Sequence, residues 1–356
     1  MLSLLYAENR KCVNPGKYGT IPRMQEDALI PVIAIVGPTA VGKTALALTL
    51  GETLAVEVVS ADSRQFYRYM DIGTAKPTVE ERTRVVHHLI DIAAPDETVG
   101  LALFLRLARA TIVDVAERGR LPLLVGGTGQ YVRALLEGWQ VPEVLPDPAL
   151  RATLEAQATA DPTALWSRLI ELDAEAGTFI DPRNVRRVIR ALEVCLKTGR
   201  PFSQQRQRLP PPYRTLQIGL TMERAALYAR ADARVEAMMT AGLVAEVEGL
   251  LQRGYDWRLP AMSGLGYGQF RPYFTGEATL AEVVEHIKLD THAFIRRQYA
   301  WFHPLAENIH WLDSAADAVA LVKDFLEATP PARGALSPSP AQPRGSSSAC
   351  TRGSSD

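Results

Sequence analysis

The sequence predicts an α/β protein with a P-loop parallel-sheet core flanked by helices and a small helical domain inserted into that core. Three observations lead to this prediction. An apolar strand at 32–36 runs directly into a glycine-rich turn and a helix. Apolar strands then alternate with helical stretches up to residue 136, which indicates a parallel sheet. At 141–148 the composition changes to a proline-rich segment, and the pattern after it is helical to about residue 199.

These patterns divide the chain into four parts. Residues 1–30 lack periodicity and are expected to be an N-terminal extension, within which Met24 is a candidate start. The core is predicted to comprise two segments, 31–140 and 213–328, with the inserted helical domain at 141–212 between them. The remaining residues, 329–356, are rich in Pro, Ser, Gly and Ala, and we expect them to be disordered.

Within the core, apolar runs and helical periodicity place the individual elements. Further strands are expected at 56–59, 121–125 and 215–220. Helices are expected at 45–50, 102–118, 131–136, 223–253 and 279–299. The carboxyl ends of parallel strands form the ligand-binding edge of such sheets, so residues that follow strand ends are the first candidates for a site.

Composition excludes several classes of protein. The 356 residues carry a net charge of −1, so any basic surface must be local. The three cysteines are far apart and form no CxxC, which predicts neither a zinc site nor a disulfide framework and fits a reducing cytosol. No apolar run is long enough to span a membrane, and the first residues do not resemble a signal peptide. We expect a cytoplasmic, monomeric protein without membrane partners.

The most specific motif follows the first strand and fits G-x-x-x-x-G-K-[ST], the P-loop. Its glycines let the backbone curl, so that successive N–H groups and a helix N-terminus face an anion. The lysine supplies a point charge for a terminal phosphate, and the threonine hydroxyl can hold Mg²⁺. We predict polyphosphate binding, rather than a chance match on a buried strand, at Gly37, Pro38, Thr39, Ala40, Val41, Gly42, Lys43 and Thr44.

Two polar residues follow the ends of the next core strands. Asp62 can serve as a general base if it lies within hydrogen-bond reach of a substrate N–H or O–H, or it can hold Mg²⁺ through water. A capping or turn aspartate would suit the same Ser-x-Asp-Ser segment. Thr128 follows the strand at 121–125. Because the P-loop, Asp62 and Thr128 all follow strand ends, they can converge on one crevice.

Arginines gather on a predicted helix of the inserted domain. Arg183, Arg186, Arg187 and Arg190 have the spacing i, i+3, i+4, i+7, which places them on one helix face. Between residues 183 and 208 there are eight basic residues and one acid. Like charges on one face repel unless an anion meets them, so this pattern favours a nucleic acid over a merely solvated face. The basic and aromatic segment 296–302 can stack on RNA or pack on the core.

Several segments, taken together and in order, resemble the tRNA dimethylallyltransferase family, also called tRNA isopentenyltransferase. Those in the first half are Gly37–Thr44, Ser60–Ser63, Met70–Pro77, His88–Asp91 and Leu124–Tyr131. Those further along are Arg186–Val194, Gly242–Leu243, Gly266–Tyr267 and Arg297–Phe302. The resemblance covers about residues 31–310, and no Cys/His zinc finger follows it, as is typical of bacterial members.

This resemblance implies transfer of a dimethylallyl group from dimethylallyl diphosphate to N6 of the adenosine immediately 3′ of the anticodon. It implies that the P-loop binds the diphosphate with Mg²⁺ at Thr44, and that Asp62 takes the N6 proton while Thr128 holds the base. Candidates for a further diphosphate contact are Arg224, Arg230 and Arg234. Implied contacts to the tRNA anticodon stem-loop are Asp62, Ser63, Arg64, Gln65, Thr128, Arg151, Arg186, Arg187, Val188, Ile189 and Arg190.

Two other functions are compatible with parts of the sequence. A small-molecule P-loop kinase using ATP usually needs an acid after a buried strand to hold Mg²⁺. The strand at 121–125 ends in Gly-Gly-Thr instead, and Asp91 is only a weak substitute. A non-catalytic RNA-binding protein would leave both the intact P-loop and Asp62 unexplained.

Overall fold

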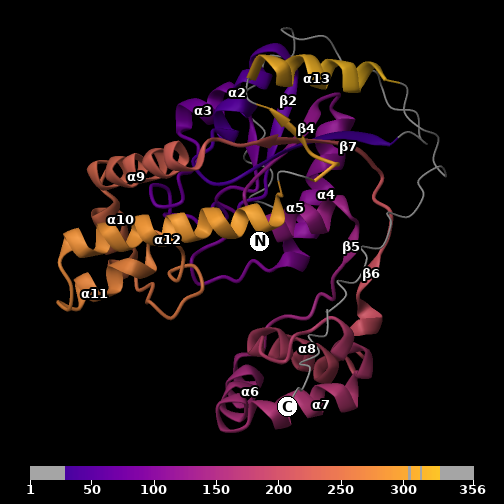
Figure 1. The fold of residues 1–356 in the computed structure, drawn as a ribbon, viewed down its shortest axis with the longest axis vertical. Helices are drawn as coiled ribbons and strands as arrows, with labels where there is room; N and C mark the ends of the chain where they lie inside the picture. The colour runs from indigo at the N-terminus through magenta and orange to yellow at the C-terminus, as the bar shows by residue number, and fades with distance from the viewer. Residues whose placement is uncertain (1–28, 304–305, 313–314, 329–356) are drawn as a thin grey trace, which may run out of the picture.

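The computed structural model describes residues 29–303, 306–312 and 315–328 (Figure 1). Most of the expected N-terminal extension, including Met24, and the expected tail at 329–356 lie outside the described residues. None of the helices in the described ranges is long and apolar enough to cross a membrane.

A six-stranded sheet forms the centre of the molecule, and every neighbouring pair of its strands is parallel. In spatial order the strands are β3 (His87–His88), β2 (Val56–Ser60), β4 (Leu121–Val125), β1 (Ile30–Val36), β7 (Tyr213–Leu220) and β8 (His310–Leu312). The predicted α/β class is therefore confirmed. Since the strands run in one direction, the loops that follow β1, β2, β4 and β7 open at the same edge.

Helices cover both faces of the sheet, which explains why β1 reads as an unbroken apolar run. Ile33 and Ile35 pack on one face with residues of α2 (Lys43–Thr53) and α13 (Ala315–Glu327). Val32 and Ala34 point to the other face, where residues of α4 (Leu101–Glu117) and α5 (Gly129–Leu136) meet them. The short helix α3 (Val79–Arg84) precedes β3.

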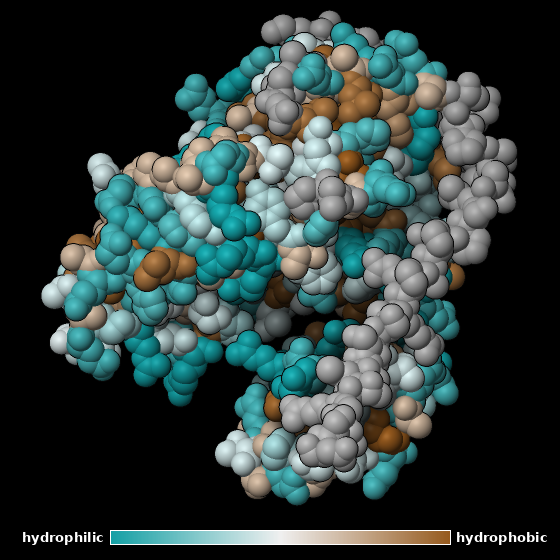
Figure 2. Space-filling view, viewed as in Figure 1, coloured by the Kyte–Doolittle hydropathy of each residue, from teal (hydrophilic) through white to brown (hydrophobic). Residues whose placement is uncertain are grey.

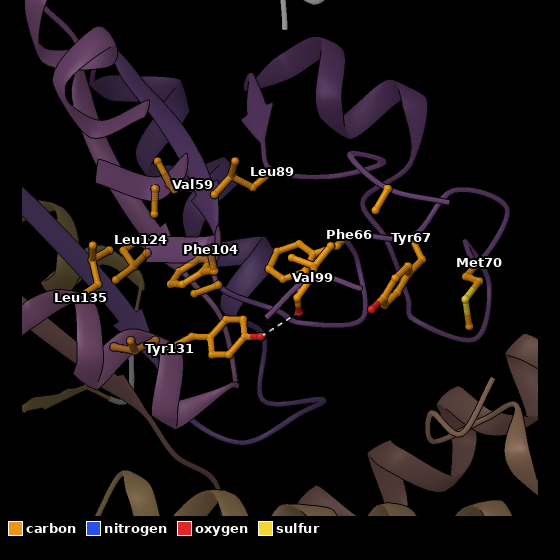
Figure 3. Packing of buried hydrophobic residues seen from close by; sticks show 14 of the residues in the cluster. Val59, Phe66, Tyr67, Met70, Leu89, Val99, Phe104, Leu124, Tyr131 and Leu135 are labelled. Atoms are coloured by element: carbon orange, nitrogen blue, oxygen red, sulfur yellow. Dashed lines mark hydrogen bonds between the residues drawn. The ribbon is translucent and has the colours of Figure 1, made fainter. Parts of the chain in front are cut away.

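Three aromatic rings anchor the loop that follows β2 (Figure 3). Phe66 of this loop lies 6.0 Å, centroid to centroid, from both Phe104 of α4 and Tyr131 of α5. Phe104 and Tyr131 are themselves stacked at 4.5 Å. Burial raises the pKa of Tyr131 to about 12, so its hydroxyl stays protonated and donates to the Val99 carbonyl at 3.4 Å. This packing holds the segment carrying Asp62 against the helices of the core.

A further layer of helices lies beside the carboxyl edge of the sheet (Figure 1). It comprises α9 (Arg224–Thr240), α10 (Leu243–Gln252), η3 (Gly268–Phe270), α11 (Arg271–Phe274) and α12 (Leu280–Trp301). The prediction of one helix over 223–253 is wrong, because the chain turns at Gly242, whose φ is 98°. Glycine adopts this left-handed conformation without steric cost, so α9 ends and α10 begins there. A capping box at Thr279 and Glu282 starts α12 close to the predicted position.

The segment between α5 and β7 leaves the core and returns at one point. There β5 (Trp139–Gln140) pairs antiparallel with β6 (Gln207–Arg208). Beyond this pair lie α6 (Pro148–Ala160), α7 (Pro162–Leu172), η1 (Ala174–Thr178), α8 (Val185–Thr198) and η2 (Ser203–Gln205). These helices share an apolar cluster of their own, which includes Leu154, Leu169 and Leu192. Figure 2 shows the hollow between this helical lobe and the core.

A buried carboxylate in β2 ties the sheet to α4. Glu57 is 1% exposed and accepts hydrogen bonds from Arg118 and from His88 Nε2, the latter at 2.6 Å. Arg120 Nε lies 2.8 Å from the same carboxylate. Burial by itself would raise the pKa of Glu57, but the His88 and Arg118 hydrogen bonds outweigh it and lower the pKa from 4.5 to about 2.

We therefore predict an acid-sensitive contribution of Glu57 to stability. A carboxylate whose pKa is lower in the folded state stabilises the fold fully above pH 4.5, and this stabilisation is lost as the pH falls towards 2. Urea unfolding of wild type and Glu57→Gln from pH 7 to pH 2 measures it. The variant should be less stable at pH 7 and should lose less stability below pH 4.5. Parallel profiles would contradict the prediction, and the exposed Glu117→Gln should follow wild type.

Candidate active site

The P-loop joins β1 to α2 through three residues with positive φ, two of which are glycines. Gly37, Ala40 and Gly42 have φ values of 136°, 64° and 110°. A Cβ at Gly37 would lie 2.4 Å from the Leu220 carbonyl oxygen of β7. Gly42 precedes α2, and no side chain caps the N-terminus of this helix. The first N–H groups of α2 are therefore available to an anion, as the motif predicts.

Lys43 is held inside the loop. Its Nζ donates to the carbonyl oxygens of Gly37 at 3.0 Å and Pro38 at 2.7 Å. Burial lowers the pKa of Lys43 to about 8, although the Asp62 carboxylate acts in the opposite direction, and Arg234 adds to the lowering. A bound diphosphate would supply the negative charge that this buried ammonium lacks. Thr44 lies half-buried in the first turn of α2.

The three arginines of α9 do not occupy equivalent places. Arg234 donates from NH1 to Thr39 Oγ1 at 3.4 Å, and burial lowers its pKa. Arg230 lies one turn earlier, with its guanidinium 3.8 Å from where a Cβ of Gly42 would be. Arg224 is exposed at the start of the helix and lines a separate hollow with Tyr228. The structure therefore brings Arg230 and Arg234 to the P-loop and not Arg224.

Asp62 and Thr128 lie on adjacent loops that touch. Asp62 Oδ1 accepts the backbone N–H of Arg64 at 2.9 Å, so the turn role considered above is present. Within the described residues, no group donates a hydrogen bond to Oδ2. Thr128 Oγ1 accepts the backbone N–H of Ser63 at 3.2 Å and lies 3.4 Å from Ser63 Oγ. These contacts join the loop after β2 to the loop after β4.

A cavity of about 570 Å³ collects these groups at the carboxyl edge of the sheet. Residues anticipated from the sequence that line it are Thr39, Ala40, Asp62, Ser63, Arg64, Thr128 and Arg234. Arg64 also donates to the Pro260 carbonyl at 2.9 Å, which ties the cavity wall to the loop before η3. The predicted convergence of the P-loop, Asp62 and Thr128 is thus observed.

Two residues assigned to ligand contacts have side chains directed elsewhere. Gln65 does not line the cavity, because its amide accepts from Ser60 Oγ at 3.0 Å and donates to the Ala75 carbonyl at 3.3 Å. The side chain of Val41 packs in an apolar cluster with Leu227 and Ile295. Val41 can therefore contribute only its backbone to a phosphate site.

The cavity wall opposite the sheet comes mainly from α12. The end of this helix belongs to the basic and aromatic segment 296–302, for which the sequence left RNA stacking and core packing both open, whereas its earlier turns were not assigned to the site. The lining residues of this helix include Asp290, Phe294, Arg297, Gln298 and Trp301. Their spacing of i, i+4, i+7, i+8 and i+11 is that of one helix face. Asp290, Arg297 and Gln298 are polar, whereas a helix face that packs on the core is expected to be apolar. Polar residues at this spacing are therefore the sequence signal that could have assigned α12 to the site.

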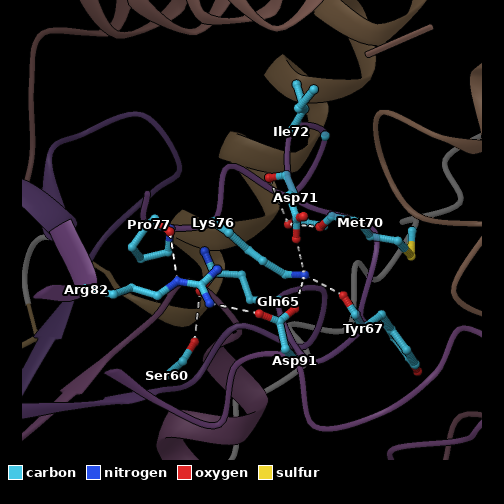
Figure 4. A network of polar contacts seen from close by, with 12 residues as sticks. Ser60, Gln65, Tyr67, Met70, Asp71, Ile72, Lys76, Pro77, Arg82 and Asp91 are labelled. Atoms are coloured by element: carbon cyan, nitrogen blue, oxygen red, sulfur yellow. Dashed lines mark hydrogen bonds and ion pairs between the residues drawn. The ribbon is translucent and has the colours of Figure 1, made fainter. Parts of the chain in front are cut away.

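Two charged side chains, Lys76 within the segment Met70–Pro77 and Glu246 outside it, hold this segment beside the site. Lys76, whose side chain is 1% exposed, donates to Asp71 at 2.7 Å and Asp91 at 2.6 Å (Figure 4). Glu246 of α10 accepts three consecutive backbone N–H groups, those of residues 71–73, at 2.8–3.1 Å. Gly73 lines the cavity, and a Cβ there would lie 2.6 Å from the Tyr267 ring. The motif therefore fixes backbone beside the cavity.

The arginines of the inserted segment fall into two sets. Arg151 and Arg190 both bind Glu193, which is fully buried: Arg151 NH2 lies at 2.8 Å and Arg190 NH1 at 2.6 Å. Burial alone would raise the pKa of Glu193, but hydrogen bonds from Arg151 and the Asp147 backbone are stronger and lower it. Arg190 also donates to the Val144 carbonyl at 3.0 Å. These two side chains therefore hold the lobe together.

The remaining positions of α8 differ in exposure. Arg186 and Arg187 are exposed. Arg183 precedes the helix, so the prediction that it shares a helix face with them is wrong, and its side chain is paired with Asp181 at 2.8 Å. Val188 and Ile189, at 1% and 5% exposure, lie in the apolar cluster of the lobe. An amphipathic helix turns these two side chains inwards, so a tRNA contact at these positions would involve only their backbone. Arg186 and Arg187 are therefore available to an anion.

The fold and the site define a class of enzyme. A P-loop shares one cavity with the Asp62 carboxylate in the loop after β2, while β4 is followed by Gly126, Gly127 and Thr128 rather than by an acid. This is the arrangement of a transferase that binds a phosphorylated donor and a second substrate together.

Comparisons with known proteins identify the family. Family models described as IPP transferase and isopentenyl transferase match residues 65–304 and 30–91. The chain is 62% identical over 302 residues to the tRNA dimethylallyltransferase of Roseiflexus castenholzii, covering 85% of this chain and 99% of that protein. It is 59% identical over 281 residues to that of Chloroflexus aurantiacus, covering 79% and 95%.

Solved structures of proteins from the same family also match this chain. The full-length tRNA isopentenylpyrophosphate transferase of Bacillus halodurans matches with a TM-score of 0.62 and 40% identity, over 83% of this chain and 97% of that one. A eukaryotic dimethylallyltransferase acting on tRNA matches with a TM-score of 0.73 and 26% identity, over 87% and 82%. The chain belongs to the tRNA dimethylallyltransferase family, which confirms the resemblance and favours a prenyl transferase over the kinase alternative.

Proposed function

We propose that the protein transfers the dimethylallyl group of dimethylallyl diphosphate to N6 of the adenosine 3′-adjacent to the anticodon of tRNA, giving N6-isopentenyladenosine. One observation supports this above all: Thr39 and Arg234 of the phosphate side and Asp62 of the acceptor side line one cavity. Family membership supports the same reaction. We further propose that the enzyme works as a monomer in the cytoplasm, where tRNA and the diphosphate are both available.

The reaction follows from this placement. The N6 nitrogen attacks C1 of the dimethylallyl group, the bond between C1 and the diphosphate oxygen breaks, and Asp62 takes the proton from N6. Lys43, Arg230 and Arg234, together with the open N-terminus of α2, stabilise the negative charge that grows on the leaving diphosphate. The adenine must leave its stack to reach the cavity, where Thr128 holds it.

The residues present fit a Mg²⁺ ion that is carried by the substrate. In the described part of the chain, no group of three or more His, Cys, Asp or Glu side chains is placed to hold a metal. Mg²⁺ commonly binds through one or two protein oxygens plus substrate phosphates and water, and Thr44 supplies such an oxygen beside Lys43. When bound, the ion would neutralise charge on the diphosphate.

Transfer of label tests the proposal against its alternatives. The protein is incubated with Mg²⁺, dimethylallyl diphosphate labelled in the dimethylallyl group, and unmodified tRNA, which is then digested to nucleosides. Label in isopentenyladenosine is the expected result. Transfer from γ-labelled ATP to a small molecule would instead indicate a kinase. Binding of tRNA with no transfer from either donor would indicate a non-catalytic RNA-binding protein.

The exposed arginines of α8 lead to a prediction about tRNA affinity. Phosphate contacts position RNA without reading its sequence, and each one lost lowers the salt dependence of binding. We expect Arg186→Ala/Arg187→Ala to weaken all substrate tRNAs similarly and to reduce the slope of log affinity against log salt by about one to two units. Turnover at saturating tRNA should change little, because neither side chain lines the cavity.

Filter binding across a salt series provides the measurement, with Arg84→Ala, an exposed arginine of α3 paired with Glu52, as the control. An unaltered slope in the double variant would mean that Arg186 and Arg187 only solvate the helix. Arg190→Ala is unsuitable for this purpose, because it leaves the buried Glu193 with one partner fewer and should destabilise the lobe.

A further inference from the structure

One buried amide joins the two halves of the site. Gln298 of α12 is 3% exposed, and its Oε1 accepts the backbone N–H of Thr39 in the P-loop at 2.7 Å. Its Nε2 donates to the carbonyl oxygen of Gly127, in the loop after β4, at 3.0 Å. The first contact spans 259 positions of sequence and the second spans 171. The amide group thus uses both its acceptor and one donor to link loops that are distant in the chain.

The surrounding packing leaves α12 little freedom against these loops. A Cβ at Gly127 would lie 2.2 Å from Gln298 Nε2, and a Cβ at Gly129 would lie 2.3 Å from Cβ of Trp301. The missing Cβ at Gly129 lets the helix approach the loop this closely, and the missing Cβ at Gly127 leaves the Gln298 amide in place. The end of α12 is seated directly on the backbone that leads into Thr128 and α5.

The same two loops carry the groups that meet the two substrates. Thr39 donates its N–H to Gln298 and accepts at Oγ1 from Arg234, so it belongs to the phosphate side. Gly127 directly precedes Thr128, whose hydroxyl contacts Ser63 next to Asp62, on the acceptor side. Lys43 Nζ also lies 3.7 Å from where a Cβ of Gly127 would be. The Gln298 amide therefore spans the boundary across which the dimethylallyl group must pass.

We propose that Gln298 is a positioning residue for the transfer reaction, an inference that rests on the proposed function. It holds the P-loop and the loop after β4 at a constant separation, so that C1 of the donor lies in line with the N6 nitrogen. Gln298 itself makes no bond to the reacting atoms. The role requires a donor and a strong acceptor on one side chain of this length, whereas a methionine of similar size has no donor and only a weakly accepting sulfur.

Gln298→Met tests the proposal because it keeps side-chain volume and removes both hydrogen bonds. A misplacement of about 1 Å at reacting atoms can cost 10²-fold in rate. We expect kcat to fall by roughly 10–100-fold, while the KM for dimethylallyl diphosphate and the KM for tRNA each stay within about threefold. Gln298→Asn, which keeps the amide one methylene short of both partners, should not restore kcat.

The control is Val283→Ala, which removes buried packing from the opposite end of the same helix. It should lower the thermal midpoint at least as much as Gln298→Met and leave kcat unchanged. A kcat of Gln298→Met within twofold of wild type would overturn the proposal. So would a loss of kcat in Val283→Ala equal to that in Gln298→Met, because general loosening of α12 would then explain both. If the wild type itself transfers no label to tRNA, the proposed function fails, which is a separate result.

Discussion

Replacing Asp62 with asparagine is expected to slow single-turnover transfer by about 10²–10⁴-fold, the usual effect of losing a general base. Asparagine has the size and shape of aspartate, so the substitution should leave the loop after β2 in place. Asparagine retains the Oδ1 that accepts the Arg64 N–H at 2.9 Å, so the turn that shapes this loop should persist. The substitution removes the carboxylate that takes the N6 proton. The accepting atom is Oδ2, to which no group donates a hydrogen bond among the described residues.

Transfer is followed by rapid quench at saturating tRNA, and tRNA affinity is measured separately by filter binding. Affinity should stay within about threefold of wild type, because the size and the turn contact of residue 62 are kept. Asp96→Asn, which changes an exposed acid outside the cavity, serves as the control and should transfer normally. A transfer rate for Asp62→Asn within about threefold of wild type would show that another group is the base.

Removing the charge of Lys43 is the second change with a large expected effect. Lys43→Met keeps the apolar stem of the side chain but leaves the diphosphate without its ammonium. Loss of one group that stabilises developing negative charge typically costs about 10²–10³-fold in rate. Inhibition by inorganic pyrophosphate, competitive with dimethylallyl diphosphate, should weaken in parallel. An unchanged inhibition constant would contradict the assignment of the P-loop to the diphosphate.

The pH dependence provides a second measurement on the same variant. Because burial lowers the pKa of Lys43 to about 8, the free enzyme loses this positive charge as the pH rises through 8. A bound anion raises the pKa, so pyrophosphate binding takes up a proton above that pH and weakens as the pH rises. Wild type should therefore show a steeper loss of affinity between pH 7 and pH 9.5 than Lys43→Met. Identical profiles would mean that Lys43 does not face the anion.

Features that depend on local chemistry could be predicted without the structure. The P-loop was recognisable because its glycines, lysine and flanking strand are contiguous in the chain. The meeting of Thr39, Asp62 and Thr128 was also predictable, since each follows a strand of one parallel sheet and such strands end at one edge. The helices α4 and α12 were predictable because a helix that packs one face on the core repeats its apolar residues with the period of the helix.

The partners of charged and polar side chains were not predictable in this way. Glu193 was visible as the only acid among eight basic residues, yet the sequence does not show that it is buried and binds Arg151 and Arg190. Those contacts turn part of an apparent phosphate-binding face into the internal support of the lobe. The break at Gly242 was likewise undetermined, because glycine is compatible with both a helix interior and a left-handed turn.

By itself, then, the sequence determined the class of fold, the phosphate-binding loop and the carboxylate that follows β2, because each depends on neighbours in the chain or on the direction of parallel strands. Only the tertiary structure decided that Arg234 and Arg230 rather than Arg224 reach the P-loop, that α12 closes the cavity, and that Gln298 bridges its two sides. These choices depend on how helices distant in sequence pack against the sheet, and a hydrogen bond across 259 residues leaves no periodic trace in the chain.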